Sequence, residues 1–261
     1  MKRGRLRIAE RRCYHVTHRC QERKFFLYFD IDRKNYADRL REAKDRFPVD
    51  VLDYMITSNH VHLLFYSETG KAVSDAMHFI QGAAARDYNR RKEREGAFWN
   101  GRFRPTLIQD GIHLSRCILY ISLNMLRAGA VRHPDEWKTC GYHELAGFRE
   151  RKLIVNRERL LSCLCHQGDY GGFVDWYRKT IDKTANSIVP GRDPLWTEST
   201  AVGDLEWIES LAHSHVIGRK EIVGLREESP AFALGVRESS ASYGLKISER
   251  FRNDFAFSKN R

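Results

Sequence analysis

The chain has 261 residues, of which 42% are hydrophobic and 30% charged, a balance that excludes a fibrous or low-complexity protein. Its 45 Lys and Arg against 34 Asp and Glu give a formal charge of +11, so we expect a polyanionic partner such as nucleic acid. Because no apolar run is long enough for a membrane span or a secretory signal, we predict a cytoplasmic protein without membrane association.

The first part of the chain alternates predicted strands and helices. The run "YHVTHR" at 14–19 alternates β-branched and aromatic residues and predicts a first strand. Residues 31–47 form a helix by periodicity, with apolar side chains spaced four, three and four apart, and Pro48 ends it. The runs "VDVLDYMIT" at 49–57 and "HVHLLFY" at 60–66 flank the polar pair "SN", which predicts an antiparallel hairpin.

Three further elements complete the predicted domain. We expect a helix over 72–92, a strand at "RPTLIQ" (104–109) and a helix over 114–128 that Gly129 closes. This order predicts an α+β fold, a ferredoxin-like split βαβ antiparallel sheet with helices on one face, followed by one added helix. We predict a domain over 1–150 and a mostly helical C-terminal appendage over 151–261.

The motif "NHVHLL" at 59–64 places two histidines on one side of a predicted strand, because side chains alternate between faces. His60 and His62 could therefore share a divalent cation, although two half-exposed sheet histidines are the commoner outcome for such a pair. On the last predicted helix, Tyr120 and Asn124 lie four residues apart and hence on one face, among apolar neighbours. For each pair taken alone, a packing role is the better explanation.

Together, the four residues predict a chemistry. Two neutral imidazoles and an amide oxygen can hold a hard cation that polarises a phosphodiester, while a phenol attacks the phosphorus. The phosphotyrosine bond would conserve the bond energy for rejoining, so no ATP is expected.

The segments "YHVTHR", "NHVHLLF", "FWNGRFRPTLI" and "YISLNMLRAGAV", in this order, resemble the single-tyrosine HUH transposases, in particular the REP-associated tyrosine transposases. The resemblance covers about residues 10 to 150. It implies that His60, His62 and Asn124 bind magnesium or manganese and that Tyr120 becomes joined to a DNA 5′-phosphate. It also implies metal-dependent cleavage and transfer of single-stranded, hairpin-forming or repeat-end DNA.

Two residues depart from the pattern of that family. It commonly has "YIHLNP" where this chain has "YISLNM", so Ser122 replaces a histidine and Met125 replaces a proline. The nucleophile and the amide are kept, but the helix is expected to end differently.

Basic and aromatic residues predict the DNA contacts. Residues 1–24 carry nine Lys or Arg and two acidic residues, and "FWNGRFR" interleaves rings with arginines, which suits stacking on unpaired bases. For Trp99, burial as a core anchor is an equally good interpretation. The predicted DNA-binding residues are Arg12, Arg19, Arg86, Arg90, Trp99, Arg102 and Arg104.

Two other classes of function compete with this reading. A ferredoxin-like sheet could be a non-catalytic nucleic-acid-binding module, whose binding would not depend on the histidine pair. A histidine-triad hydrolase would need a histidine where Leu64 stands. His15 and His18 are three residues apart and so face opposite sides of the first strand, which makes each a structural residue rather than a ligand. The chain could act as a monomer or a homodimer.

The six cysteines form no CxxC pair, and we expect reduced thiols. The run "CLCH" at 163–166 lacks a second ligand pair at the spacing of a zinc finger, so no zinc site is predicted there.

Overall fold

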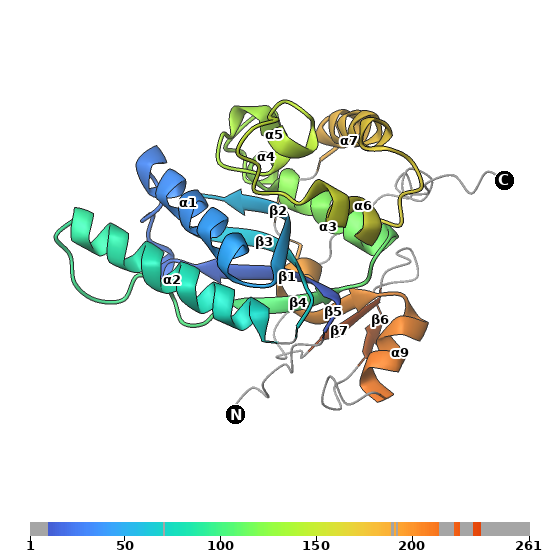
Figure 1. The fold of residues 1–261 in the computed structure, drawn as a ribbon, viewed down its shortest axis with the longest axis horizontal. Helices are drawn as coiled ribbons and strands as arrows, with labels where there is room; N and C mark the ends of the chain where they lie inside the picture. The colour runs from blue at the N-terminus through green and yellow to red at the C-terminus, as the bar shows by residue number, and fades with distance from the viewer. Residues whose placement is uncertain are drawn as a thin grey trace.

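The structure is a computed structural model that describes residues 10–69, 71–188, 191, 193–213, 222–224 and 232–235. Residues 1–9 of the basic N-terminal stretch, and the end of the predicted appendage after 235, lie outside the described residues. Within the described part, the strands form one seven-stranded sheet in the order β2-β3-β1-β4-β5-β7-β6 (Figure 1).

The first six main elements follow the predicted order. They are β1 (Arg12–Arg19), α1 (Asp30–Arg46), β2 (Val49–Ile56), β3 (His60–Ser67), α2 (Ala72–Arg91) and β4 (Arg104–Ile108). β3 lies between β1 and β2 and is antiparallel to both, and β4 is antiparallel to β1 on the other side. This is the split βαβ arrangement, so the predicted α+β, ferredoxin-like core is confirmed.

The two faces of the sheet are covered by different helices. On one face, His18 of β1 contacts the Tyr36 hydroxyl of α1 at 2.6 Å and the Gln81 side chain of α2 at 3.2 Å. On the other face, the ring of His15 contacts Tyr120 of α3 (Ile112–Ser122). α1 and α2 lie side by side on one side of the sheet, and α3 lies on the opposite side (Figure 1). His15 and His18 therefore point to opposite faces, as predicted.

The helix expected over 114–128 is divided into two. α3 ends at Ser122, Leu123 has φ −87° and ψ 7°, and α4 (Asn124–Arg127) begins at the next residue. Gly129 follows with φ +68°, the left-handed conformation that glycine adopts without steric cost at a helix C-terminus. The predicted end of the helix is confirmed, and the break at Leu123 is an addition.

Residues after 128 add short helices and three strands. These elements are η2 (Pro134–Glu136), α5 (Tyr142–Leu145), α6 (Arg157–Cys163), α7 (Tyr170–Ala185), α8 (Leu195–Glu198), β5 (Ser199–Gly203), α9 (Leu205–His213), β6 (Ile222–Gly224) and β7 (Phe232–Gly235). The short η1 (Gln21–Arg23) follows β1. α5, α6 and α7 gather around α3 and α4 (Figure 1).

The segment after residue 150 contributes to the same sheet as the first four strands. β5 runs parallel to β4, with Leu107 opposite Ala201, and β7 and β6 extend the sheet beyond it. The helices of the predicted appendage are present, and the strands among them were not expected. The domain boundary at 150 stays a prediction. None of the helices in the described ranges combines the length and apolar composition that a membrane span needs.

Candidate active site

The two histidines of β3 point to the face that α3 covers. Their ring centroids are 5.0 Å apart and nearly perpendicular, at 75°. His62 lies opposite Thr17 and is 2% exposed, while His60 lies opposite Arg19 near the end of the strand and is half-buried. The alternation predicted from the sequence therefore brings both imidazoles to one side.

Tyr120 of α3 and Asn124 of α4 both approach His62 from the helices that cover this face of the sheet. The Asn124 side-chain nitrogen lies 3.2 Å from Nε2 of His62. The ring of Tyr120 lies 5.8 Å from that of His62, edge to face. A rotation of the Asn124 amide by half a turn would place its oxygen, a ligand for a hard cation, at the same point. The structure thus brings together Tyr120, His62 and Asn124, with His60 beside them.

His62 is held by a second histidine that the sequence did not assign to the site. Nε2 of His15 lies 2.9 Å from Nδ1 of His62, and the two rings stack at 5.1 Å. Nδ1 of His15 lies 2.8 Å from the backbone carbonyl oxygen of Trp196 in α8. A carbonyl only accepts, so His15 donates from Nδ1 and accepts at Nε2 from the N–H of His62. The lone pair of His62 is then on Nε2, which faces Asn124.

Burial keeps this pair of imidazoles neutral. It lowers the pKa of His15 to about 4. It also holds the pKa of His62 well below its ordinary value, and the charges of His60, His15 and nearby arginines act in the same direction. Neutral imidazole is the form that binds a metal. A His62 ring with its proton on Nδ1 is therefore ready to bind a cation through Nε2.

His60 is oriented in the same manner by the turn between the two hairpin strands. Its Nδ1 lies 2.7 Å from Oδ1 of Asn59 and 2.9 Å from Oγ1 of Thr57. The Thr57 hydroxyl donates to the His60 carbonyl at 2.8 Å, so its oxygen accepts from the ring. The proton of neutral His60 is then on Nδ1 and the lone pair on Nε2. Both histidines of the motif fit a shared cation.

Tyr120 lies in an enclosed place and is 7% exposed. The guanidinium carbon of Arg127 is 4.0 Å from the centre of its ring, and Arg127 also donates to the Tyr120 carbonyl. The indole of Trp196 lies 5.8 Å from the same ring. Arg127 was not predicted from the sequence. A cation over the ring favours the negative charge of a phenolate.

Ser122, which stands where the similar transposases have a histidine, points into the core. Ser122 is buried, and its hydroxyl lies 2.7 Å from that of Tyr177 in α7 and 3.4 Å from Oδ2 of Asp53. Burial raises the pKa of Asp53 well above its ordinary value. Ser122 therefore joins α3 to β2 and α7, and the departure at this position leaves Tyr120 and His62 in contact.

The predicted DNA contacts fall on different faces of the molecule. Arg19 and Arg104 lie opposite His60 and Thr17 in the strand register, on the face of the histidine pair. Trp99 donates from its indole nitrogen to the carbonyl of Gln81 at 2.9 Å, on the side of α2. The remaining predicted DNA contacts are exposed: Arg12 on β1, Arg86 and Arg90 on α2, and Arg102 in the loop before β4.

Comparisons with known proteins find a family match in the first half of the chain. Residues 9–123 match the model of the family described as Transposase IS200 like. No curated protein matches the chain. Among solved structures, the chain is similar to a REP-associated tyrosine transposase bound to a REP hairpin, at a TM-score of 0.49 and 15% identity over 56% of this chain and 86% of that one. A suspected transposase from Deinococcus radiodurans R1 has a TM-score of 0.32 and 21% identity over 40% of this chain and 84% of that one.

Proposed function

We propose that this protein cuts and rejoins single-stranded DNA with Tyr120 as its nucleophile, because residues 9–123 match the model of the IS200-like transposases. The family match supports a DNA-processing transposase, and the finer chemistry is our inference from the site. One observation carries it: the Asn124 amide lies 3.2 Å from Nε2 of His62, and the ring of Tyr120 lies 5.8 Å from the same imidazole.

The proposed reaction exchanges one ester bond for another. The Tyr120 oxygen attacks the phosphorus, so a Tyr–O–P bond forms while the bond from phosphorus to the 3′-oxygen breaks. The phenol proton passes to solvent, and the departing 3′-oxygen takes up a proton. The 5′-phosphate stays on Tyr120, and a 3′-hydroxyl reverses the step. Because the bond energy is conserved, no ATP is needed.

His60, His62 and Asn124 would hold magnesium or manganese. Two neutral imidazole nitrogens and an amide oxygen suit such a cation, and the nitrogen donors favour manganese over magnesium. When bound, the cation would polarise the phosphodiester that Tyr120 attacks. The contribution of the chain is to keep both lone pairs on Nε2, through His15 for His62 and through Asn59 and Thr57 for His60.

The proposed substrate is a single strand with hairpin or repeat-end structure. The formal charge of +11 supports a nucleic acid, and Arg19 and Arg104 flank the histidine pair on its own face. We propose that these two contact phosphates next to the cleaved bond. Arg12, Arg86, Arg90, Trp99 and Arg102 are proposed to contact the strand or hairpin further away.

A non-catalytic DNA-binding module is the second candidate, and the small exposure of Tyr120 favours it. Tyr120 is 7% exposed and contacts both Trp196 and Arg127, so a strand would reach it only after neighbouring side chains move. In such a module, binding would depend on salt and not on the metal, and the tyrosine would be a packing residue.

The two candidates are separated by a covalent adduct. The protein is incubated with manganese and a pool of hairpin DNAs with randomised single-stranded flanks, labelled at the 3′ end, because the 3′ portion stays on the protein. We expect an adduct that survives denaturation for the wild type and for Tyr88→Phe on α2. Tyr120→Phe should bind the pool and form none. An equal adduct with Tyr120→Phe would refute the proposal, and salt-sensitive binding with no adduct in any variant would establish the binding module.

A further inference from the structure

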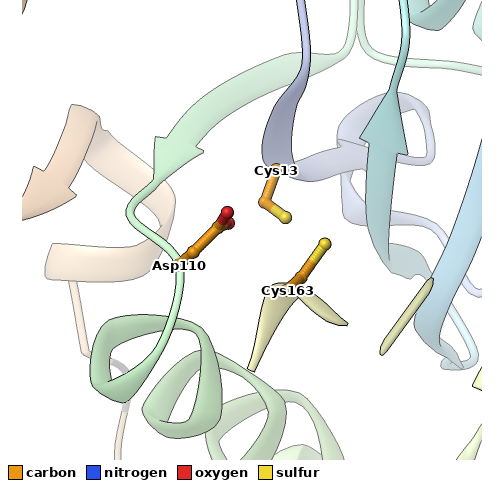
Figure 2. Close-up of side chains that lie close together, drawn as sticks. All are labelled: Cys13, Asp110 and Cys163. Atoms are coloured by element: carbon orange, nitrogen blue, oxygen red, sulfur yellow. The ribbon is translucent and has the colours of Figure 1, made fainter. Parts of the chain in front are cut away.

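Three side chains from distant parts of the chain meet next to the N-terminal end of α3, away from the end that carries Tyr120. Cys13 lies on β1, Asp110 in the turn between β4 and α3, and Cys163 at the end of α6. Figure 2 shows the two sulfur atoms and the carboxylate pointing toward one another. All three ligand atoms lie within 4.8 Å of one another. The fold thus supplies Cys163 with the partners that its own sequence neighbourhood lacks.

We propose that Cys13, Asp110 and Cys163 form a zinc site, separate from the histidine pair and independent of the proposed DNA chemistry. Thiolate ligands select zinc over magnesium and manganese. With zinc–sulfur bonds of about 2.3 Å and zinc–oxygen bonds of about 2.1 Å, tetrahedral ligands lie about 3.4 to 3.8 Å apart. Separations within 4.8 Å need only small side-chain movements to reach that spacing.

The surroundings of the three residues fit a metal at the surface of the core. Cys13 is fully buried and Cys163 is 3% exposed, while Asp110 is exposed and gives the site access to solvent. Water supplies the remaining ligand on the side of Asp110. When zinc binds, each thiol loses its proton to solvent, and the cation offsets the cost of burying two thiolates.

The carboxylate of Asp110 adds a charged oxygen ligand beside the two thiols. Its oxygen and the two sulfur atoms lie within 4.8 Å of one another. A carboxylate beside two thiols therefore disfavours their ionised form unless a cation joins them. A disulfide between the two cysteines would leave Asp110 without a role. The set of two sulfurs and one oxygen is a metal-binding set.

The site would fix the helix that carries the nucleophile. The Gly111 N–H already donates to the Cys163 carbonyl at 2.8 Å, so α6 is joined to the turn that begins α3. Tyr120 lies eight residues after Ile112, about 12 Å along the helix axis at 1.5 Å per residue. Zinc bound here would join β1, α3 and α6 at the end of α3 opposite Tyr120.

Cobalt tests the site, because a thiolate-bound cobalt absorbs intensely in the near ultraviolet and a cobalt on histidine and amide ligands does not. Full-length reduced protein is titrated with Co²⁺ and then with Zn²⁺. We expect the thiolate band to saturate at about one equivalent of cobalt and zinc to abolish it. Cys140→Ser is the matched control, since that buried thiol contacts the Trp137 carbonyl elsewhere, and it should keep the band.

Two variants decide the ligands. Cys13→Ser should lose most of the band, and Asp110→Asn should lower the affinity for zinc by about tenfold or more. Asp110 is exposed, so this second variant keeps the test valid if Cys13→Ser does not fold, which circular dichroism would show. The proposal is overturned if the wild type shows no thiolate band, if Asp110→Asn binds zinc as tightly as the wild type, or if mass spectrometry finds a Cys13–Cys163 disulfide that persists at cytosolic glutathione potential.

Discussion

His15 and His62 face each other across β1 and β3, with Nε2 of His15 2.9 Å from Nδ1 of His62. A second hydrogen bond joins Nδ1 of His15 to the backbone carbonyl of Trp196 in α8. The backbone carbonyl of Trp196, acting through His15, therefore determines which ring nitrogen of His62 carries the proton. If His62 binds a cation, His15 is a positioning residue for it.

Replacement of His15 should weaken the metal site without removing it. We expect His15→Ala to raise the manganese concentration needed for half-maximal adduct formation by about 10- to 100-fold, and saturating manganese to restore most of the rate. His15→Gln, which offers a carbonyl oxygen to the His62 N–H, should recover part of the affinity. His18→Ala is the control, because His18 is also buried but on the opposite face. The same manganese dependence in both alanine variants would contradict the positioning role.

Asn124 should be replaceable only by a side chain that offers oxygen. Its amide lies 3.2 Å from Nε2 of His62, so Asn124→Asp should retain adduct formation with manganese, whereas Asn124→Leu should lose it by about 100-fold or more. Chelation with EDTA should abolish the reaction of wild type and Asn124→Asp alike. An Asn124→Leu variant that reacts at the wild-type rate would exclude Asn124 from the metal site.

Arg127 should affect the chemical step more than binding. Its guanidinium lies 4.0 Å from the centre of the Tyr120 ring. In the proposed reaction it would stabilise the phenolate and the charged phosphate. We expect Arg127→Met to lower the single-turnover cleavage rate at saturating DNA by about 100-fold, with a change of Kd below about threefold. Arg102→Met, in the exposed loop before β4, is the control for charge alone. A loss confined to Kd would assign Arg127 to DNA binding.

The arginines on the two faces should differ in their effect on cleavage. Arg19→Ala and Arg104→Ala should each make the plot of log binding constant against log salt concentration less steep, by about the contribution of one phosphate contact. Both should also slow cleavage at saturating DNA. Arg86→Ala, on α2, should reduce the slope alone. Fluorescence anisotropy over a range of salt concentrations, together with single-turnover cleavage, measures both. Cleavage slowed by Arg86→Ala and not by Arg19→Ala would place the scissile bond elsewhere.

The core could be predicted from the sequence because its elements are long and regular. Strand alternation and helical periodicity predicted β1 to β4, α1 and α2, with ends within two residues of those observed. The break at Leu123 was missed because the apolar spacing continues through it. The strands β5 to β7 were missed because segments of three to five residues carry too little pattern, and β5 pairs in parallel with a strand about 90 residues earlier.

The site was predicted as far as local spacing allows. His60 and His62 share a face by alternation, but the approach of Asn124 to His62 depends on how α3 and α4 pack, which no spacing gives. The role of His15 depends on strand register and on α8, far along the chain. Cys13, Asp110 and Cys163 likewise meet only in the folded protein. Tertiary contacts between distant segments account for each of these omissions.

Identification of the residue to which DNA becomes joined is the most direct test of the proposed role of Tyr120. The manganese-dependent adduct is digested with nuclease and protease, and the peptide that retains a nucleotide is sequenced by tandem mass spectrometry. We predict a 5′-phosphorylated nucleotide on the hydroxyl of Tyr120. A nucleotide on another residue, such as Tyr88 or Tyr142, or an adduct through the 3′-phosphate, would contradict the central claim.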